Sequence, residues 1–177
     1  MLKTKKMSND YESVSDDLLT PNLKGARLRA KNIWNEFCGA KIPVKLNDII
    51  QKMGIDIRGE DLNSADAITR MDSNGVCCMV YDQNSSVVRK RFTIAHEIGH
   101  LAMEHTSSWG GCNQFSKKSQ EKEADAFAGE LLVPSEDLKE FTKQKRTIQE
   151  IMSRYWISNP AAFVAVQNNR LLDRIKI

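Results

Sequence analysis

Apolar residues recur along most of this chain at the three- and four-residue spacing of amphipathic helices. The clearest case is segment 87–103, where positions 94, 95, 98, 101 and 102 are apolar and form one helical stripe. Further helices are predicted over residues 22–37, 47–54, 119–132, 147–156 and 159–172, with a short one beginning near residue 134. The pattern therefore favours a mainly helical protein.

Three short segments have the alternating or β-branched character of strands instead. They cover residues 55–57, 67–71 and 76–81, and Asn74-Gly75 between the last two is typical of a tight hairpin turn. We therefore predict an α+β fold. It is mainly helical, with a small antiparallel three-stranded sheet packed against the helix of residues 87–103.

Two of the three histidines lie in that helix, within His96-Glu97-Ile98-Gly99-His100. Residues four apart lie one turn apart on one helix face, so both rings can reach one Zn²⁺ ion at about 2.0–2.1 Å. Glu97 then lies beside the ion, where it can accept a proton from a water molecule. Gly99 costs about 1 kcal/mol relative to Ala inside a helix, which indicates close packing there. The simpler alternative is a pair of histidines on a helix surface.

A catalytic zinc site needs a third protein ligand, and segment 119–132 can supply it. Glu121 and Asp125 share one helix face, so Glu121 would bind the metal and Asp125 would accept the free N–H of a ligating histidine. Glu123 is an alternative ligand, but it lies about 200° around the helix from Glu121, so both cannot serve. Each acid could instead be a solvated surface group. The spacing favours Glu121.

These segments resemble the ImmA/IrrE family of zinc metallo-endopeptidases. The resemblance is most specific over residues 91–100, 121–128 and 131–134, and it extends more weakly over roughly residues 22–172. It implies a zincin-like domain in which the His-Glu-x-x-His helix and the downstream Glu-x-x-Ala-Asp-x-Phe-Ala segment build the zinc site. Many relatives carry a histidine where this chain has Glu104, and His105 follows here.

The resemblance also implies a function. It predicts a site-specific zinc-dependent endopeptidase that cleaves a regulatory protein, a helix-turn-helix repressor of a phage or integrative element encoded nearby, and so relieves repression. The alternative is a zinc-stabilised protein that sequesters a repressor without cutting it, and a third is a toxin–antitoxin or DNA-binding component. Glu97 favours the peptidase, because a structural zinc site needs no carboxylate aimed at a water. We expect the substrate to lie extended along an edge strand, residues 76–81.

The sequence does not identify the oxyanion-stabilising donor or the role of Cys112. An oxyanion-stabilising donor is expected, with His105, Tyr81 and an arginine as candidates. Cys112 lies in the loop predicted between the two ligand helices, where a thiolate could reach zinc. A buried reduced thiol is the favoured interpretation, because none of the four cysteines has the spacing of a structural zinc site.

Length and composition limit the remaining choices. The 177 residues fit one domain, with a disordered tail (1–20), a metallopeptidase core (21–134) and C-terminal helices (135–177) packed on that core. A net charge of +3 without a basic stripe and interleaved aromatics gives no reason to expect direct nucleic-acid binding. No apolar run approaches the roughly 18 residues of a membrane span. Residues 1–17 lack an apolar secretory region, so we expect a cytoplasmic protein.

Overall fold

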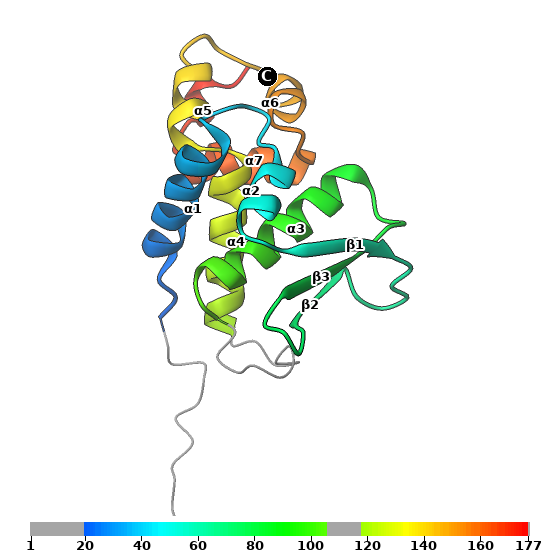
Figure 1. Cartoon of the computed structure of the whole chain (residues 1–177). Coiled ribbons are helices and arrows are strands. Elements are labelled where there is room, and N and C mark those ends of the chain that lie inside the picture. The colour runs from blue at the N-terminus through cyan, green and yellow to red at the C-terminus, as the bar shows by residue number, and fades with distance from the viewer. Residues whose placement is uncertain (1–19, 106–117, 177) are drawn as a thin grey trace, which may run out of the picture.

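The computed structural model describes residues 20–105 and 118–176. Within these ranges the protein is mainly helical, and a small three-stranded sheet lies at one side of the helices (Figure 1), so the predicted α+β class is confirmed. The elements in chain order are α1 (Leu23–Cys38), α2 (Leu46–Lys52), β1 (Asp56–Glu60), β2 (Ala67–Met71), β3 (Cys77–Asp82), α3 (Val87–Ala102), α4 (Lys118–Leu132), α5 (Ser135–Phe141), α6 (Ile148–Tyr155), α7 (Asn159–Asn168) and the 3-10 helix η2 (Leu172–Arg174). The predicted tail, apart from Thr20, and Cys112 lie outside the described residues.

The last α-helix is shorter than the sequence pattern predicts. α7 ends at Asn168 and not near residue 172. The side chain of Asn169 donates a hydrogen bond to the carbonyl of Ala165 (2.9 Å), and Arg170 has a positive φ of 56°. Both features end an α-helix, because the first occupies a helix carbonyl and the second breaks the helical backbone.

In the parts of the chain that the structure describes, no helix has the length and apolarity needed to cross a membrane.

The sheet is mixed, which corrects the expectation of a fully antiparallel one. β3 lies in the middle: β2 pairs with it antiparallel, as the predicted hairpin requires, but β1 pairs with it parallel. The segment 61–66 connects β1 to β2 on the opposite edge, and β3 then enters between them. Alternation along a strand reports its faces and not its direction. The expected substrate strand, residues 76–81, is therefore central and its edges are both occupied.

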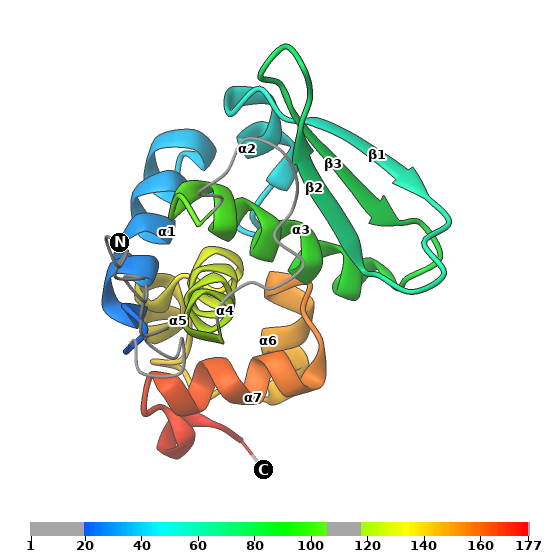
Figure 2. The same ribbon diagram turned by 90° about the horizontal axis from the view of Figure 1, so that it is seen from below.

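Helix α3 lies between the sheet and α4 (Figure 2). It contacts the sheet mainly through β2 and β3, and it packs along its other side on α4. Ser86 begins α3, since its hydroxyl accepts a hydrogen bond from the backbone N–H of Arg89 at 3.3 Å. The helix that carries both motif histidines is thus held on two sides.

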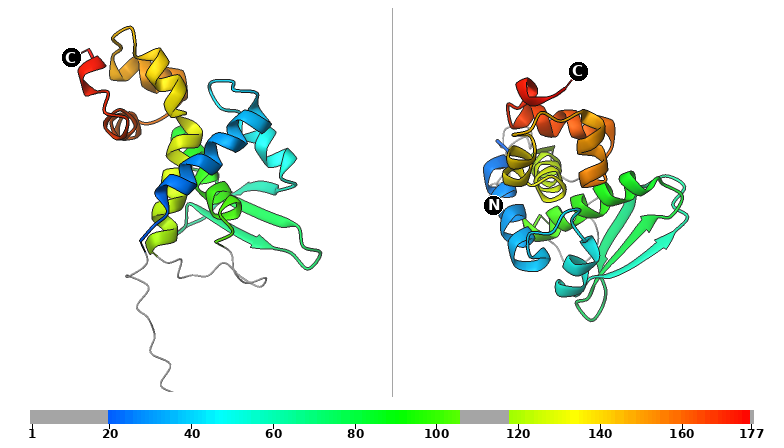
Figure 3. Two further views of the ribbon diagram at one scale, coloured as in Figure 1. Left: turned by 90° about the vertical axis from the view of Figure 1, so that its left-hand side faces the viewer. Right: turned by 90° about the horizontal axis from the view of Figure 1, so that it is seen from above.

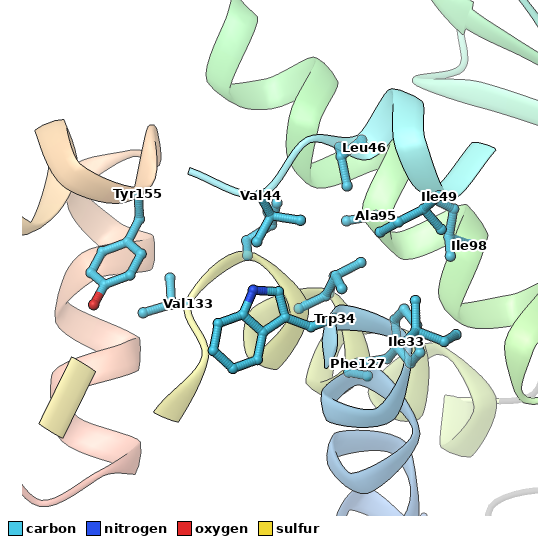
Figure 4. Packing of buried hydrophobic residues seen from close by; sticks show 14 of the residues in the cluster. Ile33, Trp34, Val44, Leu46, Ile49, Ala95, Ile98, Phe127, Val133 and Tyr155 are labelled. Carbon is cyan, nitrogen blue, oxygen red and sulfur yellow. The ribbon is translucent and has the colours of Figure 1, made fainter. Parts of the chain in front are cut away.

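Helix α4 forms the centre of the helical part. It packs against both α1 and α3, and α1 crosses it in the side view (Figure 3). Figure 4 shows Phe127 of α4 beside Ile33 and Trp34 of α1, all of them buried. The same buried cluster includes residues of the C-terminal helices, namely Leu138, Ile151, Tyr155, Ile157, Ala162, Val166 and Leu171. We therefore propose that residues 135–176 belong to the same domain as residues 21–134.

Gly99 lets α3 and α4 approach each other closely. A Cβ atom at this position would lie 3.1 Å from Cδ1 of Phe127 and 3.2 Å from the Cα of Ala124. Such distances are tighter than ordinary van der Waals contact, and one of the neighbours is backbone that cannot turn aside. The packing reason expected for this glycine is present, and it sets the spacing between the two helices.

We expect Gly99→Ala to destabilise the protein, although alanine is the better helix former. Alanine gains about 1 kcal/mol in helix propensity, but overpacking costs typically about 1–3 kcal/mol. A net loss of about 1 kcal/mol lowers Tm by roughly 2–4 °C in a domain of this size. Gly129→Ala in α4 is the matched control, because a Cβ there meets nothing within 4 Å. Thermal unfolding of the metal-free proteins measures both, and an equal rise in Tm for the two would contradict the packing argument.

Asp137 joins the C-terminal helices to one another. Its carboxylate accepts two hydrogen bonds from Arg154 (3.0 and 2.8 Å) and one from the hydroxyl of the buried Tyr155 (2.6 Å). Burial alone would raise the pKa of Asp137, but these hydrogen bonds outweigh it and lower that pKa below its usual value. The ionised carboxylate is therefore the form that the folded protein stabilises.

Asp137→Asn should lower the free energy of unfolding by about 1–3 kcal/mol near neutral pH, because hydrogen bonds to a charged group are lost. The folded pKa of Asp137 is depressed, so its stabilisation is full above the unfolded pKa of about 3.9 and disappears as the pH falls through the folded value. The stability difference between wild type and variant should accordingly shrink below about pH 4. Urea unfolding at a series of pH values measures it. If the domain proposal holds, one transition shifts as a whole, and a separate C-terminal transition would contradict it.

Candidate metal centre

The two motif histidines of α3 lie next to each other on the helix face that points to α4. Their side chains are mostly buried, with exposed fractions of 16% for His96 and 13% for His100. The two Nε2 atoms are 3.0 Å apart, and the rings meet edge to face with centroids 4.8 Å apart. The four-residue spacing thus places two candidate ligand nitrogens beside each other.

Glu121, in the first turn of α4, points to the same place. One carboxylate oxygen is 3.1 Å from Nε2 of His96, and the other is 3.3 Å from Nε2 of His100. The candidate ligand atoms of these three residues all lie within 4.8 Å of one another. The structure therefore brings together the three residues that the sequence nominates, from two helices whose spacing Gly99 sets.

The donor set fits a zinc ion. Two imidazole nitrogens and one carboxylate oxygen are a known ligand set of catalytic zinc, which leaves a fourth position for water. Tetrahedral ligands at about 2.0–2.1 Å from the metal lie roughly 3.3 Å from one another. The two Nε2 atoms are 3.0 Å apart, and each lies 3.1 or 3.3 Å from one of the two Glu121 carboxylate oxygens, which is the same order of separation.

Asp125 contacts the His96 ring at Nδ1, the nitrogen that faces away from the candidate centre. One carboxylate oxygen is 2.9 Å from Nδ1 of His96, the contact expected from the sequence. An ionised carboxylate only accepts hydrogen bonds, so Nδ1–H donates and the lone pair of Nε2 faces the candidate centre. Burial opposes protonation of His96, but the hydrogen bond and charge of Asp125, followed by the charge of Glu121, outweigh it and raise the pKa of His96.

His100 has the opposite electrostatic setting. Burial, and after it the neighbouring His96, lower the pKa of His100 to about 4. A ring with this pKa is neutral near pH 7, which is the form that binds a metal ion.

Glu97 is largely enclosed beside the candidate ligands. Burial raises its pKa, while the neighbouring Thr69 of β2 and His96 oppose that rise. The carboxyl of Glu97 thus lies between the sheet and the candidate metal centre. A raised pKa is typical of carboxyl groups that exchange protons during a reaction.

Glu123 does not join the candidate ligands. Its carboxylate is 2.7 Å from Nε2 of His105 and accepts a hydrogen bond from the backbone N–H of Asn22 at 2.6 Å. His105 in turn lies against His100, with the Nδ1 atoms 3.0 Å apart. The sequence offered Glu123 as an alternative ligand and His105 as a candidate oxyanion donor, but it did not pair the two residues. The sequence indicated only that Glu123 and Glu121 lie on different faces of the helix. It did not indicate which residue contacts Glu123.

These contacts bear on the oxyanion donor expected from the sequence. Both ring nitrogens of His105 already have partners, so this side chain has no N–H left for a substrate. Tyr81 of β3 packs its ring over Gly59 of β1, 3.1 Å from where a Cβ would stand. The His105 ring is therefore already engaged, whereas Tyr81 stays a candidate donor.

A hollow of about 710 Å³ lies beside the site, against α4 and between α1 and α7. Asp125 and Phe92 line it, whereas none of the three candidate ligands does. The ring of Phe92 is 6.3 Å from that of His96, centroid to centroid. The hollow thus reaches the side of His96 that Asp125 contacts.

The fold and the site together define a class: a helical α+β protein with a His-Glu-x-x-His helix facing a glutamate helix, as in single-metal peptidases. The family model of the IrrE N-terminal-like domain, Peptidase_M78, matches residues 50–163, well over half of the chain. The chain therefore belongs to this metallopeptidase-type family, as its resemblance to ImmA/IrrE proteins predicts.

Comparison with solved structures shows the same fold in another protein. A solved structure of a Mycobacterium tuberculosis transcriptional regulator is similar, with a TM-score of 0.59 and 12% sequence identity. The match covers 78% of this chain and 45% of the regulator, so this chain spans less than half of that protein's length. No curated protein is significantly similar to the chain in sequence. At such low identity the regulator shows the fold alone.

Proposed function

We propose that this protein is a zinc-dependent endopeptidase that cleaves a regulatory protein at a specific site. The observation that carries the proposal is the meeting of His96, His100 and Glu121 at one point, with Glu97 enclosed beside them. Membership of the Peptidase_M78 family supports it. A site built only to stabilise the fold needs no additional buried carboxyl beside the ligands.

His96, His100 and Glu121 would hold the ion. Zinc, when bound, would lower the pKa of a coordinated water and polarise the peptide carbonyl. Glu97 would take the proton from the attacking water and then deliver it to the leaving amine. Thr69 of β2 would steady the Glu97 carboxyl, and Asp125 would keep the His96 ring in one orientation.

The substrate would bind along β2. Among the described strands β2 pairs with β3 alone and forms an edge of the sheet, where an extended peptide would add by main-chain pairing. Thr69 of this strand neighbours Glu97, which supports β2 as the strand beside the candidate centre. Main-chain pairing is tolerant of sequence, so selectivity for one target would come from surfaces outside the catalytic centre.

The proposed substrate is a helix-turn-helix repressor encoded near this gene on a phage or integrative element, with cleavage relieving repression in the cytoplasm. Membership of the IrrE-like family supports a regulatory target, because the resemblance to ImmA/IrrE proteins implies one. The test is to incubate the purified protein, with zinc, with the repressor encoded beside it. Mass spectrometry should find two fragments from one cut, and a zinc chelator should abolish them. An intact repressor in a stable complex would instead support sequestration.

A further inference from the structure

We infer that Glu123 and His105 form a positioning relay that fixes His100 in the tautomer needed for metal binding. The inference rests on the proposed metal centre, and it assigns a role to two residues outside the candidate ligand set. It starts from a chain of three contacts that leads from the backbone of α1 to the ring of His100.

The relay is nearly enclosed in protein. The side chains of His105 and Glu123 are only 7% and 14% exposed, and Nε2 of His105 is 2.7 Å from the Glu123 carboxylate. On its other side Nδ1 of His105 is 3.0 Å from Nδ1 of His100, and the two rings meet edge to face. When buried polar atoms lie this close together, each contact needs one donor and one acceptor. Two donors or two acceptors facing each other would cost free energy.

The order follows from which atoms can donate. The carboxylate of Glu123 only accepts, so Nε2 of His105 carries a proton and donates it. In the neutral ring, Nδ1 of His105 is then an acceptor, and the facing Nδ1 of His100 must donate. This leaves the lone pair of His100 on Nε2, the atom that lies 3.0 Å from Nε2 of His96 and 3.3 Å from Glu121.

Glu123 is itself held in place by α1. Its second carboxylate oxygen accepts the backbone N–H of Asn22 at 2.6 Å, and the side chain of Asn22 caps α1 through the N–H of Gly25. The start of α1 thus anchors the relay. Each candidate histidine ligand is then oriented by a carboxylate of α4: His96 directly by Asp125, and His100 by Glu123 through the ring of His105.

If the contact between Glu123 and His105 served the fold alone, removing it would lower the stability of the protein but leave the affinity for zinc unchanged. If it positions His100, removing it lowers the affinity for zinc as well. Partners that orient a ligating histidine typically contribute about 10–100-fold to metal affinity. Glu123→Gln keeps an acceptor for the N–H of His105, so its loss should be smaller than that of Glu123→Ala.

The experiment uses the full-length protein and zinc alone. Competition with a chromophoric chelator gives the zinc dissociation constant of wild type, Glu123→Gln, Glu123→Ala, His105→Ala and the double variant Glu123→Ala/His105→Ala. Glu140→Gln, which removes an exposed carboxylate of α5, is the control. We expect zinc binding about 10–100-fold weaker for Glu123→Ala and for His105→Ala. The double variant should bind no more weakly than His105→Ala alone, because both changes break one relay.

Two results would overturn the inference. One is zinc binding within about twofold of wild type in both single alanine variants; the other is additive losses in the double variant. Should a variant fail to fold, ¹⁵N shifts of the histidine rings in zinc-loaded wild type decide: the relay requires His105 protonated on Nε2 and not on Nδ1. Wild type that takes up no zinc would refute the proposed function as well, whereas tight wild-type binding with unaffected variants would refute the relay alone.

Discussion

Glu97→Gln should bind zinc as tightly as wild type, within a few-fold, and lose cleavage of the repressor. Glutamine keeps the shape of the side chain but cannot take up a proton, so the reaction loses its general base. Such a group typically contributes about 10²–10⁴-fold to the rate. Zinc is retained because the candidate ligands are His96, His100 and Glu121. Zinc content by mass spectrometry and the initial rate of fragment formation measure the two effects.

The same variant separates cleavage from sequestration. If the protein acts by holding the repressor, Glu97→Gln should still relieve repression in cells, because the binding surfaces are untouched. If it acts by cutting, derepression disappears together with the fragments. Glu140→Gln serves as control, since this exposed carboxylate pairs only with Lys143 at the surface of α5 in the described structure. Full derepression by Glu97→Gln would refute the peptidase mechanism.

Glu121→Gln should lose zinc. An amide oxygen is a weak ligand for this ion and carries no charge to offset it. The affinity should therefore fall by more than about 100-fold, beyond what loss of an orienting partner causes. Zinc should also stop raising the Tm of this variant, because a ligand stabilises the folded state only as far as it binds. Chelator competition and thermal unfolding with and without zinc measure both.

Glu123→Gln is the matched comparison, because the two glutamates lie two residues apart on α4 but face different partners. Its affinity for zinc should fall much less than that of Glu121→Gln. The reverse ranking, with Glu121→Gln unaffected and Glu123→Gln unable to bind, would make Glu123 the ligand. That result would contradict the geometry of α4 described above.

The sequence predicts local arrangements well because they depend on helix geometry alone. His96 and His100 had to share a face, and Glu121 and Asp125 likewise, once their segments were helical. The close packing at Gly99 was also predictable, because a glycine inside a helix lowers the stability of that helix and so indicates a packing reason. In the structure His96, His100 and Glu121 meet at one point, and Asp125 contacts His96.

Features that depend on tertiary arrangement were not accessible in the same way. The period of a strand does not encode its direction, so the parallel pairing of β1 with β3 was missed, and with it the central position of residues 76–81. The contact of Glu123 with His105 and Asn22 joins segments about 20 and 100 residues apart. No periodicity within α4 indicates which neighbour lies on that face of the helix.

The proposed activity depends on one zinc ion bound jointly by His96, His100 and Glu121. Anomalous diffraction at the zinc absorption edge from crystals of the zinc-loaded protein tests this most directly. We predict a single strong peak about 2.0–2.2 Å from Nε2 of both histidines and from the Glu121 carboxylate. A peak held by Glu123 or by a cysteine sulfur, or no peak between α3 and α4, would contradict the account.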